Sequence, residues 1–258
     1  MNSTKSIKGV FLDFWDTICT STLDQLGKIR YELCKSLDDV INNHPELKTG
    51  FTGETLLEEA WNAVSKIRKE QLIDMGEQGT ARIMTKLLSK KPEDESFLLL
   101  ELHMALTTYD LLSNVVPVEG AIETVKNLKN MGYKLGIISN TGLDPSWRLL
   151  EILEHFKIKD FFQVFVFSDQ VGFLKPHPKI FHKALIEIGY KASETVMIGD
   201  NQNIDIVGAK LMNIRGILKP FGPKQEILRI DSDQPQDLLP DKIIKDFDEL
   251  SSAILSLK

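Results

Sequence analysis

The sequence predicts an α/β fold, in which a doubly wound, Rossmann-like parallel sheet carries an inserted all-helical domain. Three observations lead to this prediction. A short apolar, β-rich run lies near the amino terminus, residues 22–115 carry apolar residues at helical spacing, and strand-like and helix-like segments alternate from residue 116 onward. Alternation of strands with helices of about 10 to 15 residues is typical of a parallel, doubly wound sheet.

The first predicted strand covers residues 7–14, because an apolar run of this kind indicates a strand buried on both faces. The next segment has almost no strand signal, and its capping pattern Thr55-x-x-Glu58 predicts the start of a helix. We expect four or five helices between residues 22 and 115. The apolar positions at helical spacing are Leu23, Leu26, Ile29, Leu33, Leu37 and Ile41, then Leu56, Leu57, Ala60, Trp61, Val64 and Ile67.

The remainder of the chain predicts the rest of the sheet. The domains are therefore expected to be an α/β core of residues 1–19 and 116–258 and a helical cap of residues 20–115. The predicted helices are 118–132, 144–156, 176–189 and 203–213, the predicted strands are 133–142, 161–169, 195–200 and 214–219, and residues 233–254 form a last short strand and a closing helix.

The composition of the chain argues against several classes of protein. The chain of 258 residues is 42% hydrophobic and 26% charged, as in ordinary globular proteins. Its net charge of -6 argues against a nucleic-acid partner, which requires a surplus of Lys and Arg. Two cysteines cannot form a disulfide framework, and no segment reaches the roughly 20 apolar residues of a membrane span. We expect a cytoplasmic monomer or homodimer without a membrane partner.

Polar residues follow four of the predicted strands. They are Asp13, the pair Ser139 and Asn140, Lys175 in the loop after its strand, and Asp200. In doubly wound sheets, ligands bind in the crevice at the carboxyl ends of the strands. The sequence therefore predicts a binding site there.

Taken together and in this order, these segments resemble the haloacid dehalogenase-like hydrolase superfamily, in the branch whose helical cap follows the first motif. The first motif matches Asp13-Phe14-Trp15-Asp16-Thr17, and the second matches Ser139 in "GIISN". The third matches Lys175 in "VGFLKPHPKIF", and the fourth, G-D-x-x-x-x-D, matches Gly199-Asp200 and Asp205. The resemblance extends over essentially the whole chain.

The resemblance implies a hydrolase that uses Asp13 as a nucleophile, Mg²⁺ as cofactor and a small phosphorylated molecule as substrate. A carboxylate nucleophile splits one displacement at phosphorus into two easier steps, and Mg²⁺ prefers carboxylate, carbonyl and water ligands. The implied metal ligands are Asp13, Asp200, Asp205 and the backbone carbonyl of Trp15. Ser139, Asn140 and Lys175 are implied to bind phosphate, and Thr17 to support the loop that orients Asp13.

Trp15 departs from the family pattern. Family phosphatases have a second Asp at this position, which protonates the leaving group, and such general acid catalysis is typically worth ~10² to 10⁴ in rate. Asp16 is the nearest other carboxylate, but it stands where the family has Gly, which favours a turn or cap residue. The sequence thus predicts a phosphatase that is slow on poor leaving groups unless Asp16 or another group supplies the proton.

Two alternatives remain open. The first is a 2-haloacid dehalogenase-like hydrolase, since these relatives carry an aromatic residue at the position of Trp15 and need no metal. Asp200 argues against it because a carboxylate repels a haloacid, while Arg68 is a candidate cap residue in its favour. The second is a catalytically weak protein that binds metal and phosphate without turnover.

Overall fold

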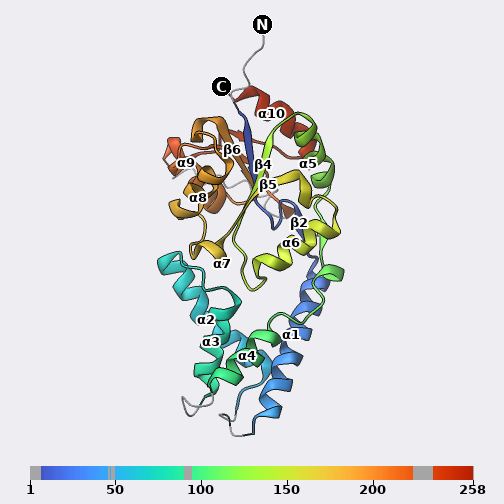
Figure 1. Cartoon of the computed structure of the whole chain (residues 1–258), viewed down its shortest axis with the longest axis vertical. Helices are drawn as coiled ribbons and strands as arrows, with labels where there is room; N and C mark the ends of the chain where they lie inside the picture. Colours follow the sequence, from blue (N-terminus) through green and yellow to red (C-terminus); the bar gives the residue numbers. More distant parts are fainter. Residues whose placement is uncertain (1–6, 46, 48–49, 90–94, 223–234, 258) are drawn as a thin grey trace. The chain divides into compact units, whose positions relative to one another are not determined.

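The computed structural model describes residues 7–45, 47, 50–89, 95–222 and 235–257. By its internal contacts the chain divides into two compact units (Figure 1). The α/β unit falls within the ranges Met1–Thr20, Val116–Asn140 and Ile152–Lys258, and the helical unit within Ser21–Val115 and Thr141–Glu151.

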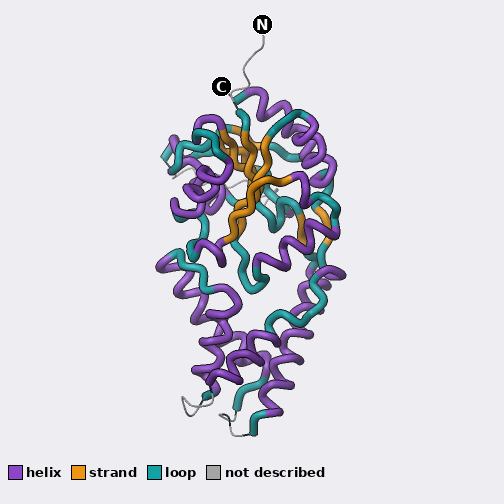
Figure 2. Tube along the Cα trace, viewed as in Figure 1, coloured by secondary structure: helices purple, strands orange, loops and turns teal. Residues whose placement is uncertain are grey.

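The α/β unit is built on a parallel sheet of six strands, in the order β5-β4-β1-β6-β7-β8. Figure 2 shows the strands of this unit in orange, with helices in purple around them. In chain order this is 3-2-1-4-5-6, the arrangement of doubly wound nucleotide-binding folds, so the predicted fold class is confirmed. The strands are β1 (Gly9–Leu12), β4 (Lys134–Ser139), β5 (Phe162–Phe167), β6 (Thr195–Gly199), β7 (Arg215–Leu218) and β8 (Lys242–Ile243). The strand order reverses beside β1, where β1 pairs with β6.

Helices connect these strands and bury one apolar face each. In the core, Phe11, Ile138 and Met197 of three adjacent strands pack with Phe181 and Ile188 of a following helix. The last helical turn of that helix ends at Gly189, which has φ of 74° and so suits glycine. The helices are α5 (Ala121–Asn130), α7 (Ser168–Val171), α8 (Pro178–Ile188), α9 (Val207–Leu211) and α10 (Leu250–Ser256), together with the last residues of α6 (Ser146–His155), whose first part groups with the helical unit.

The helical unit contains α1 (Leu23–Asn43), α2 (Gly53–Gln71), α3 (Gly76–Leu88) and α4 (Glu95–Ala105). Helix α1 packs on α2 and α4, and α3 packs on the same two helices, so each helix has two neighbours. Thr22 caps α1 by accepting from the Gln25 N–H, and Thr52 caps α2. The predicted start at Thr55 is therefore wrong by one turn, because Thr52 is the residue in extended conformation and Thr55 completes its capping box.

Residues 141–151 differ from the predicted division, which assigns all of 116–258 to the α/β domain. By contacts this segment groups with the helical unit. Arg148 Nη2 donates to the carbonyl of Tyr109 at 2.6 Å, and the Tyr109 hydroxyl donates to Asp144. These hydrogen bonds connect residues that are 39 and 35 positions apart in the sequence, so a pattern within one segment cannot predict them.

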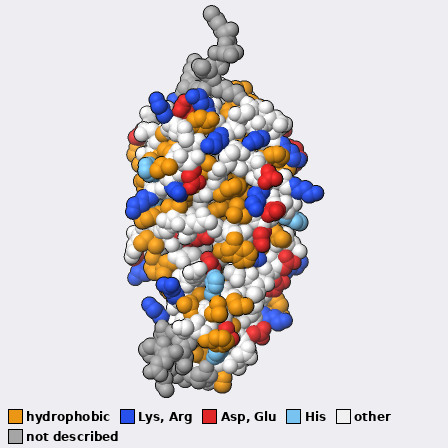
Figure 3. All heavy atoms as spheres, viewed as in Figure 1, with side chains coloured by type: hydrophobic (Ala, Val, Ile, Leu, Met, Phe, Trp, Pro, Cys, Tyr) orange, Lys and Arg blue, Asp and Glu red, His pale blue; other side chains and the backbone are white. Residues whose placement is uncertain are grey.

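The structure also contains a small antiparallel pair of strands that the sequence does not predict, β2 (Cys19–Thr20) with β3 (Val116–Pro117). These strands lie where the chain leaves the α/β unit and returns to it. Among the described residues, no helix combines the length and the apolar character needed to cross a bilayer. Basic and acidic side chains are interspersed on the face shown in Figure 3.

Candidate active site

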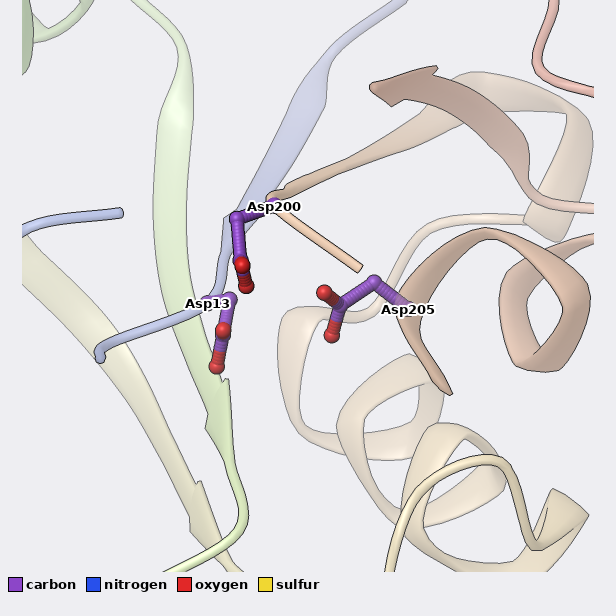
Figure 4. Close-up of side chains that lie close together, drawn as sticks. All are labelled: Asp13, Asp200 and Asp205. Atoms are coloured by element: carbon purple, nitrogen blue, oxygen red, sulfur yellow. The ribbon is translucent and has the colours of Figure 1, made fainter. Parts of the chain in front are cut away.

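Asp13 and Asp200 follow directly on β1 and β6, the paired strands at the reversal of strand order. The Asp13 N–H donates to the carbonyl of Ile198 at 2.9 Å, which extends the β1–β6 ladder to the carboxylate itself. Figure 4 shows both side chains at the carboxyl ends of these strands, with Asp205 facing them. The carboxyl edge at this point is where doubly wound sheets bind their ligands.

Asp205 reaches the same point from a single π-helical turn, Gln202–Ile206, that precedes α9. One ligand oxygen from each of Asp13, Asp200 and Asp205 lies within 4.8 Å of the others. Gly199 makes room for this approach, because a Cβ at residue 199 would stand 2.3 Å from Asp205 Oδ2. The extra residue of a π turn is frequently found at functional sites. Asp205 is held beside this strand end by Asn201, because the Asp205 N–H donates to the Asn201 carbonyl at 2.8 Å and Asp205 Oδ2 accepts the Asn201 N–H at 3.0 Å.

Lys175 is the cation of this cluster. Its Nζ donates to Asp13 Oδ1 at 2.6 Å, to Asp205 Oδ1 at 2.7 Å and to the carbonyl oxygen of Ile138 at 2.8 Å. Its side chain is 1% exposed. All three N–H groups of the ammonium are thus used by the protein, and Lys175 holds the Asp13 carboxylate in a fixed orientation.

Asn140 fixes the backbone of Lys175. Its Oδ1 accepts the Lys175 N–H at 2.8 Å, and its Nδ2 donates to the Lys175 carbonyl at 3.3 Å. Ser139, one residue earlier, is fully buried at the end of β4, and its hydroxyl lies 3.3 Å from the Asn140 carbonyl. The sequence predicts substrate binding for both residues but misses the clamp on Lys175, since two loops 35 residues apart meet there.

The electrostatics of the cluster are dominated by burial and by its excess of negative charge. Burial, followed by the negative charge of Asp205, raises the pKa of Asp13 to about 7, although Lys175 opposes the shift. For Lys175, burial acts to lower the pKa, but the charges of Asp13 and Asp205 outweigh it and the net shift is upward. Lys175 pairs with two of the three carboxylates, and the negative charge that it does not offset favours an additional cation.

The segment after Asp13 forms a tight turn that places the other predicted residues. Asp16 has φ of 60°, its N–H donates to the Cys19 carbonyl at 2.7 Å, and its Oδ1 accepts from Thr20 Oγ1 at 2.8 Å. These contacts fit the turn role, because Asp tolerates the left-handed region. The Trp15 ring packs edge-on against Phe14 with centroids 5.1 Å apart. Thr17 is buried, and its Oγ1 has no hydrogen-bond partner in the described part of the chain.

The donor set suits a hard divalent cation. Carboxylate oxygens from separate elements converge, and Mg²⁺ typically uses one or two carboxylates together with water and substrate oxygens. Both oxygens of Asp205 already accept from the protein, since its Oδ1 accepts from Lys175 and its Oδ2 accepts from the Asn201 N–H at 3.0 Å. Asp205 is thus a weaker candidate for direct metal ligation.

Comparison with known proteins identifies the family. Residues 36–219 match the family described as haloacid dehalogenase-like hydrolase. A glyceraldehyde 3-phosphate phosphatase of Methanocaldococcus jannaschii is 30% identical over 206 residues, which cover 79% of this chain and 81% of that relative. The chain belongs to the haloacid dehalogenase-like hydrolase family. The predicted resemblance is confirmed, and the matched residues begin after Asp13 and Trp15.

Other curated relatives match shorter segments of this chain. A glyceraldehyde 3-phosphate phosphatase of Pyrococcus abyssi is 39% identical over 105 residues, 41% of this chain and 43% of the relative. The pyrophosphatase PpaX of Halalkalibacterium halodurans is 33% identical over 129 residues, 49% of this chain and 58% of the relative. The chain thus spans about half the length of these curated relatives.

Solved structures confirm the fold across the chain. A phosphatase of the same superfamily from Thermococcus onnurineus has a TM-score of 0.64 and 23% identity, covering 98% of this chain and 99% of its own. A 2-haloacid dehalogenase from Pseudomonas syringae has a TM-score of 0.67 and 20% identity, covering 96% and 98%. Because both activities occur among these neighbours, the fold does not choose between them.

Proposed function

We propose that this hydrolase is a Mg²⁺-dependent phosphatase of small phosphorylated metabolites that acts through an aspartyl-phosphate on Asp13. The observation that carries the proposal is the convergence of one carboxylate oxygen from each of Asp13, Asp200 and Asp205 within 4.8 Å of one another. The Lys175 ammonium pairs with two of these carboxylates, Asp13 and Asp205. The excess negative charge of this cluster favours the binding of a further cation. The phosphatase and pyrophosphatase names of the relatives support the phosphate-hydrolysis part of the proposal.

Each residue of the cluster has a role in the proposed reaction. Asp13 and Asp200, with the Trp15 carbonyl, would hold Mg²⁺, which when bound supplies charge neutralisation for a phosphoryl group. An Asp13 carboxylate oxygen attacks phosphorus, the bond from phosphorus to the leaving oxygen breaks, and the departing oxygen, where it is basic enough to need a proton, takes it from solvent water. Water then attacks phosphorus, which releases phosphate and restores the carboxylate. Lys175 keeps Asp13 oriented for attack, and Ser139 with the backbone N–H of Asn140 receives the phosphate oxygens.

Trp15 narrows the substrate class within this proposal. An indole cannot donate a proton to a departing alkoxide as a carboxylic acid does, so cleavage of alkyl phosphates lacks a factor of ~10² to 10⁴. Leaving groups that are already weak bases, as in acyl phosphates and phosphoanhydrides, need no such proton. We therefore expect these substrates to be turned over faster than alkyl phosphate esters.

The dehalogenase alternative is disfavoured by the same cluster. A haloacid presents its own carboxylate, and three carboxylates near Lys175 repel it unless a cation intervenes. Chloride release from a 2-halo acid that persists in EDTA would select this alternative. Tight phosphate-analogue binding without turnover would select the binding-protein alternative.

The test is phosphate release from a panel of acyl phosphates, phosphoanhydrides and alkyl phosphates, with Mg²⁺ and with EDTA. Asp13→Asn is expected to remove turnover by at least about 10³-fold. Asp16→Asn is the matched control, because it changes a neighbouring carboxylate in a left-handed conformation that Asn also tolerates. Release that survives in Asp13→Asn would contradict the proposal, and loss in Asp16→Asn alone would transfer the acid/base role to Asp16.

A further inference from the structure

Lys219 is a second buried lysine beside the carboxylate cluster. It follows β7 directly, and its N–H donates to the Gly199 carbonyl at 2.9 Å. Since Leu218 pairs with Gly199 across β6 and β7, Lys219 and Asp200 are the next residues on two adjacent parallel strands. The residue therefore stands at the same carboxyl edge of the sheet as the proposed metal ligand.

The surroundings of Lys219 differ from those of Lys175. Lys219 is 4% exposed, and its Nζ lies 4.6 Å from the centroid of the Phe247 ring. Among the described residues its ammonium makes no direct ion pair, whereas Lys175 contacts two carboxylates. Burial lowers the pKa of Lys219, and the charges of Asp246 and Asp200 partly oppose the shift. Lys219 thus acts on Asp200 through its field rather than through a bond.

The two carboxylates that act on Lys219 are not equivalent. Asp246 is exposed and is the capping residue of a short 3-10 turn, so solvent screens its charge. Asp200 is 8% exposed and is screened less. The positive charge of Lys219 therefore acts mainly on the buried Asp200 and the carboxylate cluster around it.

We propose that Lys219 is a positioning residue that weakens and tunes Mg²⁺ binding by offsetting part of the negative charge at Asp200. This inference rests on the metal site of the proposed function. When all three carboxylates are ionised, they and the Lys175 ammonium leave two net negative charges. The buried charge of Lys219 lessens their mutual repulsion in the metal-free protein without occupying the oxygens of Asp200. It also repels an incoming divalent cation, which keeps the metal exchangeable.

The test is calorimetric Mg²⁺ titration of the full chain and its variants without substrate. Lys219→Met keeps the length and the packing on Phe247 but removes the charge, and it is expected to bind Mg²⁺ about five- to tenfold more tightly. Lys219→Arg keeps the charge and is the matched control, with affinity within about twofold of the parent. Lys219→Gln is a second neutral variant that carries the test if Lys219→Met fails to fold, as judged by circular dichroism.

Thermal unfolding of the same variants separates a charge effect from a packing effect. Lys219→Met is expected to unfold at a lower temperature than the parent in EDTA and to recover at saturating Mg²⁺, because the metal then neutralises the cluster. An equal deficit in both conditions, with unchanged Mg²⁺ affinity, would overturn the proposal and leave Lys219 a packing residue. Absence of Mg²⁺ binding to the parent chain would instead overturn the metal site and this proposal together.

Discussion

Buried carboxylates in the two units have opposite electrostatic surroundings. In the helical unit, the buried Asp74 accepts the Gly76 N–H at 3.1 Å and the Thr141 hydroxyl at 3.2 Å, and Arg68 lies 3.5 Å away. In the α/β unit, three carboxylates converge, and the Lys175 ammonium pairs with two of them, Asp13 and Asp205. The charge of Asp74 has the guanidinium of Arg68 beside it, whereas the charge of the three carboxylates exceeds that of the Lys175 ammonium.

This difference separates a structural charge from a functional one. A buried carboxylate whose oxygens are satisfied contributes to the fold, and removing its charge leaves its donors unpaired. A crowded cluster opposes the fold until a cation joins it, so its presence needs a reason outside stability. The cluster at the carboxyl edge of β1 and β6 has that reason in the proposed chemistry.

The largest expected effect comes from removing one carboxylate of the cluster. Asp200→Asn is expected to lower turnover by at least about 10³-fold, because the metal loses one of its two direct protein carboxylates. The parent should gain about 3 kcal/mol of unfolding free energy at a Mg²⁺ concentration a hundredfold above its Kd. Thermal melts with and without Mg²⁺ measure this gain, and a variant that retains it would place the metal elsewhere.

Adding a carboxylate should have the next largest effect. Trp15→Asp supplies a proton donor where the chain has an indole, and we expect hydrolysis of alkyl phosphates to rise by about 10- to 100-fold. Acyl phosphates should gain little because their leaving group needs no proton. Trp15→Phe is the control that keeps an aromatic ring against Phe14. An equal response of both substrate classes would show that Trp15 acts by shape alone.

Neutralising Asp74 should destabilise the fold. Asp74→Asn leaves Arg68 without its carboxylate and weakens two accepted hydrogen bonds, so the free energy of unfolding is expected to fall by about 2 to 3 kcal/mol. Thr141→Val removes one donor alone and should cost about 1 kcal/mol. Urea unfolding in EDTA measures both, and no loss in Asp74→Asn would refute its structural role.

Neutralising Asp13 should have the opposite sign. In EDTA, Asp13→Asn relieves repulsion with Asp205 and the cost of burying a charge, and we expect a gain of about 1 kcal/mol in the free energy of unfolding. The gain should disappear at saturating Mg²⁺, since only the parent then binds the metal fully. A destabilised variant in EDTA would mean that Asp13 and Lys175 form a structural ion pair, and the contrast with Asp74 would fail.

Asp241 gives the most specific test, because it is a well-satisfied carboxylate within the α/β unit. Burial acts to raise its pKa, but the Gly216 N–H, Lys210 and Arg215 outweigh burial and lower it. A lowered pKa means that the stabilisation is complete above the unfolded-state pKa of about 4 and is lost as the pH falls below it.

Urea unfolding of the parent and Asp241→Asn as a function of pH should show this dependence. We expect a difference of about 1 to 2 kcal/mol near neutral pH, and it should shrink below about pH 4. A difference that does not change with pH would assign the effect to the shape of the side chain.

The sequence predicts the sheet and its polar edge well because both have local signatures. Apolar runs mark β1, β4 and β6; Asp13 and Asp200 stand directly after β1 and β6, and Ser139 is the last residue of β4. The match to residues 36–219 confirms the family expected from these motifs. Their roles in catalysis, metal binding and substrate binding stay predictions.

The rest depends on contacts between distant segments. The Asn140 clamp on Lys175, the π turn at Gln202–Ile206 and the position of Lys219 beside Asp200 all arise when separate strands and loops meet. The grouping of residues 141–151 with the helical unit has the same origin. Periodicity and capping rules describe one segment at a time, so they contain none of this information.

The most direct measurement is acid quenching of the enzyme during turnover of an acyl phosphate with Mg²⁺, followed by mass spectrometry of the peptide that contains Asp13. The proposed mechanism predicts a mass increase of one phosphoryl group on Asp13, absent in EDTA and in Asp13→Asn. Phosphate release at an undiminished rate with no such adduct, or an adduct on another residue, would contradict Asp13 as the nucleophile.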